Sequence, residues 1–191
     1  CQLFNRDHNN GGVIELQQLS RNQAFINTSG IDFTVNYGFD VGPGDLSFQL
    51  IGTWLEKQES QTTNVDPVYD FAGSIGSTTG TSAPEWAGRF TTTYRWDNLQ
   101  AQLSARYIDE MINAQVVTGG SPVTNTGTDA TWYLDLSGSY DLMDNVQLRL
   151  GVNNLTNQDP RLYSPNVQAN TDPSVFDVLG RRYFLGVNVR M

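Results

Sequence analysis

The chain has 191 residues, 20 of them acidic and 11 basic, and a formal net charge of −9. With Lys57 as its single lysine, it lacks the basic surface that nucleic-acid binding requires, so we expect no nucleic-acid partner. No run of about 18 apolar residues occurs, which excludes a transmembrane helix within the sequence.

Apolar and polar residues alternate with a period of two along most of the chain, and this pattern predicts β-strands. Residues 1–28 are less regular and are interpreted as an outer-loop segment, with one candidate strand at Val13–Leu19. Seven strong strands are predicted after it: Ser29–Asp40, Asp45–Glu56, Glu85–Trp96, Leu99–Ile108, Ala130–Asp141, Val146–Asn154 and Arg181–Met191.

The apolar stripe of these strands has large aromatic residues at both ends and aliphatic residues between them. In the third strand, for example, it runs from Trp86 through Phe90 to Trp96. Two rows of aromatic residues around an aliphatic band are typical of a transmembrane barrel, where they lie at the two membrane interfaces. We therefore expect Leu50, Leu103 and Leu134 to face lipid, and Gln49, Gln102 and Asp135 to face inward.

Short and long connections alternate. Val41–Gly44, Asp97–Asn98 and Leu142–Asn145 are tight turns, whereas 57–84, 109–129 and 155–180 are long and polar. Outer-membrane barrels have short periplasmic turns and long outward loops. The predicted fold is all-β, an antiparallel up-and-down transmembrane β-barrel segment in the cell outer membrane. Two alternatives remain: a complete small outer-membrane barrel, closed with Val13–Leu19 as an eighth strand, and a soluble secreted β-sandwich that binds glycans or proteins.

Three motifs resemble signatures of one known protein family. Leu148 to Pro160, containing Gly151-Val152-Asn153-Asn154-Leu155, is similar to its penultimate-strand signature. Gly180 to Met191 resembles its closing strand, although Phe184 occupies a position that is usually polar. Thr28-Ser29-Gly30-Ile31-Asp32 is similar to the opening of an earlier strand.

As a set, these motifs resemble those of TonB-dependent outer-membrane receptors. The resemblance implies that residues 29–191 are the C-terminal strands of a receptor barrel of about 22 strands. It implies outer-membrane lipid, the earlier strands and plug of the same receptor, and a TonB-type energy-coupling protein as partners. The implied function is import of a scarce nutrient of the siderophore, cobalamin or carbohydrate class. It also implies that Cys1 pairs with an upstream cysteine.

Few residues of the sequence indicate catalysis, metal binding or ligand binding. His8 has no second His or Cys at ligand spacing, and no nucleophile or acid–base arrangement is evident, so we expect no metal, no cofactor and no enzymatic activity. Asp66, Tyr69, Asp70 and Phe71 place carboxylates and aromatic rings in the first long loop, where they form either a ligand-recruiting surface or a loop-packing anchor. Arg106 and Arg149, well inside their strands, are candidate lumen-facing residues for transport or plug docking, or members of a structural ladder.

Overall fold

The computed structural model describes residues 4–6, 10, 13–16, 25–76, 82–120, 124–164 and 170–190, with the backbone alone at 4–6 and 13–16. Cys1 and His8 lie outside the described residues. Within the described part of the chain, no helix is long and apolar enough to cross a membrane.

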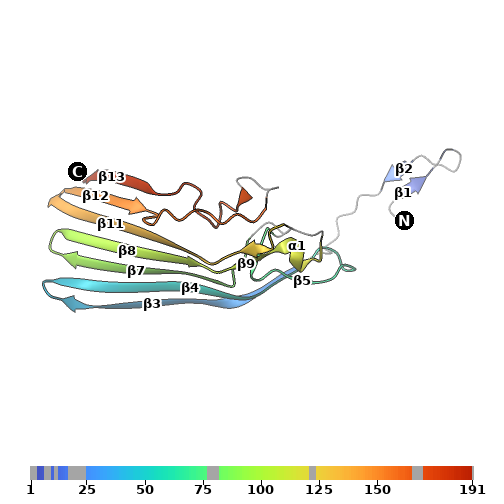
Figure 1. Cartoon of the computed structure of the whole chain (residues 1–191), viewed down its shortest axis with the longest axis horizontal. Helices are drawn as coiled ribbons and strands as arrows, with labels where there is room; N and C mark the ends of the chain where they lie inside the picture. The colour runs from blue at the N-terminus through green and yellow to red at the C-terminus, as the bar shows by residue number, and fades with distance from the viewer. Residues whose placement is uncertain are drawn as a thin grey trace.

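Seven long strands form one antiparallel sheet in which each strand pairs with its neighbour in the sequence (Figure 1). The up-and-down topology is as predicted. The strands are β3 (Phe25–Val41), β4 (Gly44–Gln61), β7 (Trp86–Trp96), β8 (Leu99–Ile108), β11 (Thr131–Met143), β12 (Val146–Asn153) and β13 (Arg182–Val189).

The sheet is open. Leu185, Val187 and Val189 of β13 pair with β12, and β3 at the opposite edge pairs with β4. The segment Val13–Leu16, strand β2, pairs with β1 (Phe4–Arg6) in a separate two-stranded sheet. The alternative of a complete small barrel is therefore contradicted within the described residues, because neither edge is closed by β2 or by the other edge.

Strand boundaries differ from the prediction where the backbone ladder continues past the hydrophobic stripe. β3 begins at Phe25, inside the predicted outer-loop segment, and β4 continues to Gln61 instead of ending at Glu56. The two strands remain paired because a bulge between Ser29 and Gly30 shifts their register. A Cβ at Gly30 would lie 2.4 Å from the backbone oxygen of Trp54, which explains the glycine of this motif.

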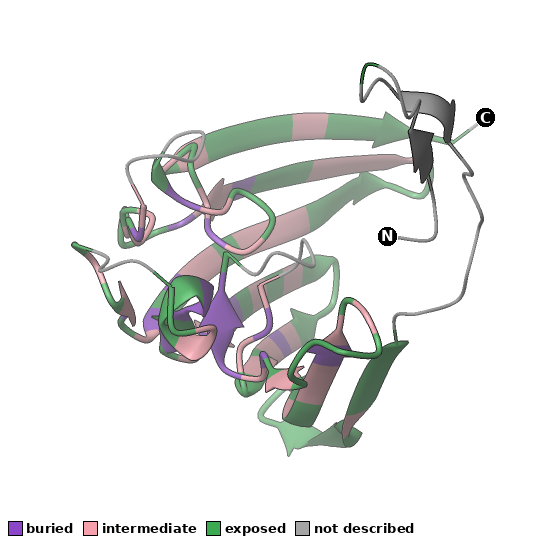
Figure 2. Cartoon of the chain, turned by 90° about the vertical axis from the view of Figure 1, so that its right-hand side faces the viewer, coloured by how far each residue is buried: buried purple, intermediate pink, exposed green. Residues whose placement is uncertain are grey.

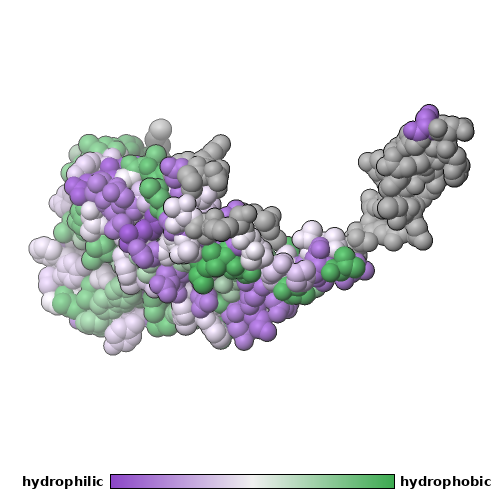
Figure 3. All heavy atoms as spheres, turned by 45° about the vertical axis from the view of Figure 1, so that its right-hand side comes forward, coloured by the Kyte–Doolittle hydropathy of each residue, from purple (hydrophilic) through white to green (hydrophobic). Residues whose placement is uncertain are grey.

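The two faces of the sheet have the predicted parity. The polar face carries Asp32, Gln49, Arg89, Gln102 and Asp135, which hydrogen-bond or pair with other residues of the same face. The apolar face carries Leu50, Phe90, Leu103, Leu136 and Leu150, and all five are exposed, Leu103 to 44%. Hydrophobic and hydrophilic residues gather in separate patches on the surface visible in Figure 3.

This exposure contradicts the β-sandwich alternative, which requires a second layer over Phe48, Leu50, Leu103 and Leu134. Leu50 and Leu103 are exposed, and Phe48 and Leu134 are only half-buried. The buried hydrophobic cluster lies instead where the long loops gather, and consists of Ile75, Ile108, Met111, Tyr133, Tyr163 and Phe176 (Figure 2).

The long loops contain short elements. β5 (Tyr69–Asp70) pairs with β4, and β6 (Ser74–Ile75) joins β9 (Met111–Asn113) and β10 (Gly127–Thr128) in a three-stranded sheet. A single helical turn, α1 (Ala114–Val117), follows β9. The first and second long loops are therefore joined by backbone pairing.

We expect Gly30→Ala to destabilise the protein by about 1–3 kcal/mol, because the added methyl group collides with the backbone of Trp54 at the bulge. Gly38→Ala in the same strand is the matched control, since its nearest neighbour would be 3.4 Å away. The measurement is urea unfolding in lipid vesicles. Equal unfolding midpoints for the two variants would show that the bulge does not require glycine.

Candidate functional site

Cross-strand hydrogen bonds connect most polar-face side chains. Gln49 donates to Asn36 at 3.0 Å, Thr53 donates to Asp32 at 2.6 Å, and Gln102 donates to Thr93 at 3.3 Å. Arg89 donates to Ser104 at 3.0 Å and lies 3.9 Å from Asp135, and Arg95 contacts both Gln100 and Asp45. These contacts form the predicted ladder between neighbouring strands.

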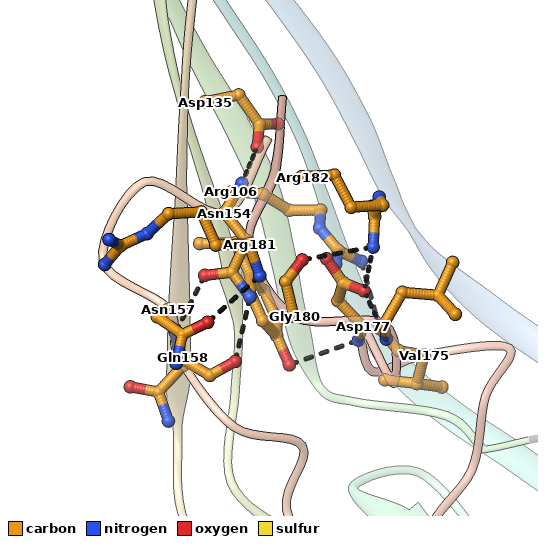
Figure 4. A network of polar contacts seen from close by, with 12 residues as sticks. Arg106, Asp135, Asn154, Asn157, Gln158, Val175, Asp177, Gly180, Arg181 and Arg182 are labelled. Atoms are coloured by element: carbon orange, nitrogen blue, oxygen red, sulfur yellow. Dashed lines mark hydrogen bonds and ion pairs between the residues drawn. The ribbon is translucent and has the colours of Figure 1, made fainter. Parts of the chain in front are cut away.

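Arg106 has different partners from the ladder residues. Its Nη1 donates to the backbone oxygen of Val175 at 2.9 Å, and its guanidinium carbon lies 4.6 Å from the centroid of the Tyr133 ring. Val175 belongs to the third long loop, so Arg106 holds this loop against the polar face (Figure 4). Tyr133 reinforces the contact, because its hydroxyl oxygen accepts a hydrogen bond from the Asp177 backbone N–H at 3.2 Å.

A polar cavity of about 400 Å³ lies between the polar face and this loop. Three arginines and two carboxylates contribute to its lining: Arg89, Arg106, Arg182, Asp135 and Asp177. Arg182 donates to Asp177 at 2.7 Å and to the Gly180 oxygen at 3.2 Å. The hydrogen bond from Arg182 holds the pKa of the Asp177 carboxyl below its ordinary value, despite partial desolvation.

Asn154 organises the turn at the end of β12. It is buried, has φ of 54°, accepts a hydrogen bond from the Gln158 backbone and donates to the Gln158 oxygen. Its own backbone N–H donates to Asp135 at 2.8 Å. Asparagine suits this position because it tolerates the left-handed backbone conformation and its amide both donates and accepts. The sequence analysis used Asn154 only as part of a motif and did not anticipate this role.

Arg149 is exposed on the polar face, between Ser139 of β11 and Gly186 of β13. Neither neighbour provides a charge. Among the described residues Arg149 has no ion pair, in contrast to Arg89 and Arg95. Arg106 and Arg149 thus share a face of the sheet, but only Arg106 contacts a loop.

The four candidate residues of the first long loop have different surroundings. Asp70 accepts hydrogen bonds from the backbone N–H groups of Gln58 and Ala72, and Asp66 accepts one from the side-chain hydroxyl of Thr63. Phe71 is only 2% exposed, and its backbone oxygen accepts hydrogen bonds from Ser74. Of the two alternatives for these residues, the buried ring of Phe71 favours the loop-packing anchor at this position, because the chain folds back along β4. Tyr69 is half-buried, with its ring centroid 6.2 Å from that of Phe71.

The three long loops also contact one another. Ser82 in the first loop donates to Asp172 in the third at 2.5 Å, and Asn125 in the second donates to the Leu162 oxygen at 2.5 Å. Asp172 also accepts from Ser174; these hydrogen bonds outweigh the opposing effect of burial and lower the pKa of its carboxyl. The loop end is a packed layer with its own hydrophobic cluster.

Comparison with protein families matches residues 3–155 to the TonB dependent receptor-like β-barrel. The chain belongs to this family. A search of curated proteins found no match. Among solved structures, the chain is similar to the ferric-catecholate import receptor Fiu from E. coli K12 in its closed form, with 17% identity and a TM-score of 0.47. The match covers 96% of this chain and 23% of Fiu, so the chain spans about a quarter of the length of that receptor.

We expect Phe71→Ala to destabilise the loop end of this TonB-dependent receptor barrel by about 3–5 kcal/mol, because it removes a buried ring. Tyr69→Ala is the matched variant, since Tyr69 precedes β6 in the same loop and is only half-buried. Hydrogen exchange at β6 and β9 measures the effect. Equal protection in the two variants would contradict the anchoring role of Phe71.

We expect the contact of Asp177 with Arg182 to persist between pH 7 and 5. The carboxyl of Asp177 has a lower pKa in the folded protein than in the unfolded chain, where the value is about 4. Its ionised form therefore stabilises the folded loop fully above about pH 4, and this stabilisation is lost as the pH falls through the lower folded-state pKa. A nitroxide label at exposed Val178 should become more mobile below about pH 4.

Asp177→Asn should give this higher mobility already at pH 7, whereas Asp144→Asn at a distant turn should not. A label that is equally mobile in the parent receptor and in Asp177→Asn at pH 7 would show that the carboxylate does not hold the loop.

Proposed function

We propose that this chain forms part of the wall of an outer-membrane receptor that imports a scarce nutrient of the siderophore, cobalamin or carbohydrate class. The exposed apolar face supports this proposal most directly. It extends over all seven long strands, while the buried cluster is confined to the loop end. An apolar sheet face with no protein layer over it is stable in hydrocarbon, where lipid replaces the missing layer.

Aromatic contacts on the apolar face support the proposed membrane orientation. Near the long loops, Trp54 stacks on Trp86 with centroids 5.9 Å apart, and Tyr107 lies 4.7 Å from Trp132. Near the tight turns, Phe39 and Phe48 are 6.1 Å apart. We infer that these groups lie at the outer and inner interfaces, respectively, so that the long loops face the outside of the cell.

The open edges support the proposed partners. β3 and β13 each have one edge without a partner among the described residues, and unpaired backbone groups are costly in hydrocarbon. We propose that other strands of the same receptor pair with both edges, that β3 and the strands after it are the C-terminal strands of the barrel, and that the residues before β3 belong to an outer-loop segment. The polar face would then line the lumen around the plug, and a TonB-type protein would supply the energy. We propose no catalytic role for the chain.

We expect Leu103→Arg to destabilise the membrane-inserted receptor by roughly 2–4 kcal/mol, because it places a cation on the lipid-facing surface near the midplane. Gln102→Leu, the adjacent change on the polar face, should cost less, because it loses only the hydrogen bond to Thr93. Folding of the full-length receptor into phosphatidylcholine vesicles, followed by urea titration, gives both values.

A large loss for Gln102→Leu together with no loss for Leu103→Arg would reverse the assignment of the two faces. The import function needs a separate test in cells. Uptake that requires both the receptor and the energy-coupling protein supports the proposal, and uptake that continues without the coupling protein contradicts it.

A further inference from the structure

An exposed aromatic ring lies on the polar face of the sheet. Phe184 of β13 is opposite Gly151 of β12, and its side chain is 39% exposed. A Cβ at Gly151 would lie 2.5 Å from Cζ of Phe184, so the ring occupies the space over this glycine, which is buried. The sequence analysis noted Phe184 only as a departure from the closing-strand motif. The structure shows that it gives this mostly polar face an exposed apolar surface.

A guanidinium group lies diagonally across the strand pair from this ring. Arg149 of β12 is opposite Gly186 of β13, two residues along the ladder from Phe184. Diagonal positions on one face of a sheet are within reach of long and aromatic side chains. A Cβ at Gly186 would meet nothing within 4 Å, so the surface beside the ring is open.

Arg149 differs from the other arginines of the described strands. Two of them, Arg89 and Arg95, contact carboxylates of the sheet. Two more, Arg106 and Arg182, bind the third long loop. Arg149 is exposed and has neither an ion pair nor a side-chain hydrogen bond among the described residues. Its guanidinium group is therefore free to pair with a carboxylate of another segment.

The position of Phe184 and Arg149 indicates which segment can reach them. The third long loop is bound to the sheet at Arg106 and Arg182, toward the loop end. Phe184 and Arg149 lie on the tight-turn side of these contacts, farther along β13 and β12 from the loop. In the proposed receptor this part of the polar face is inside the barrel. A plug in the lumen meets both side chains, whereas the third long loop is held nearer the outside.

We propose that Phe184 and Arg149 form a docking site for the plug, and that the plug segment bound there carries a carboxylate beside an apolar side chain. Arginine and a carboxylate form charge-assisted, often bidentate hydrogen bonds. The apolar side chain covers the ring of Phe184, which removes apolar surface from water. The open surface at Gly186 admits close approach of the plug. The inference rests on the proposed function, since it requires a plug in the lumen.

The occupant of the site can be identified by photo-cross-linking in the full-length receptor in isolated outer membranes. The photoreactive residue p-benzoylphenylalanine is introduced at position 184, where it conserves an aromatic ring, and cross-linked peptides are identified by mass spectrometry. We expect a peptide of the plug that contains Asp or Glu. A cross-link to the third long loop or to another barrel strand, without one to the plug, or no cross-link at all, would overturn the docking site.

The matched control places the same probe at Leu185. This residue is adjacent to Phe184 in β13, is 75% exposed and belongs to the apolar face. It should give no cross-link to the plug, because the two positions point to opposite sides of the sheet. Equal cross-linking of the plug from both positions would also overturn the assignment.

Charge reversal tests Arg149 in the same receptor, with hydrogen exchange of the plug as the measurement. We expect Arg149→Glu to lower the protection of the cross-linked plug segment about tenfold or more, because a charge-assisted hydrogen bond is replaced by repulsion between carboxylates. Arg149→Lys keeps the charge and should have a smaller effect. Exchanging the identified plug acid for arginine in the Arg149→Glu receptor should restore protection. Unchanged protection in Arg149→Glu would contradict the ion pair.

These outcomes are distinguishable from a failure of the proposed function. A full-length receptor that lacks a plug, or uptake that continues without the coupling protein, would contradict the function itself. A plug that is present but is not cross-linked from position 184 would contradict only the docking site.

Discussion

The backbone of each interior strand is hydrogen-bonded on both sides, and the rest of the structure depends on this continuous ladder. In hydrocarbon an unpaired N–H or C=O group costs several kcal/mol, so a strand in a membrane must keep both neighbours. The ladder imposes alternation of side chains between two faces. The apolar face and the polar face are therefore consequences of a single constraint, and a shift of one residue would exchange them on any strand.

The side chains of the polar face find hydrogen-bond partners in two ways. Toward the tight turns, neighbouring strands share hydrogen bonds, as with Arg95 and Gln100. Toward the long loops, Arg106 and Tyr133 bind the backbone of the third loop, so two side chains of the sheet help to position that loop. The face is thus a structural ladder at one end and a support for the loop at the other.

At the loop end, several polar side chains shape the loops that contain them. Asp70, Asp172 and Asn154 accept local hydrogen bonds that shape turns, and their chemistry is used within the protein.

The sequence alone determined the seven strands, their order, the residues on each face of the sheet and the family resemblance, because period-two alternation and turn residues are local properties. It did not determine that Phe71 is buried or that Arg106 holds a loop carbonyl, because both depend on contacts with residues distant in the chain. The extension of β3 to Phe25 was missed because a bulge, which leaves little trace in hydrophobicity, preserves the ladder.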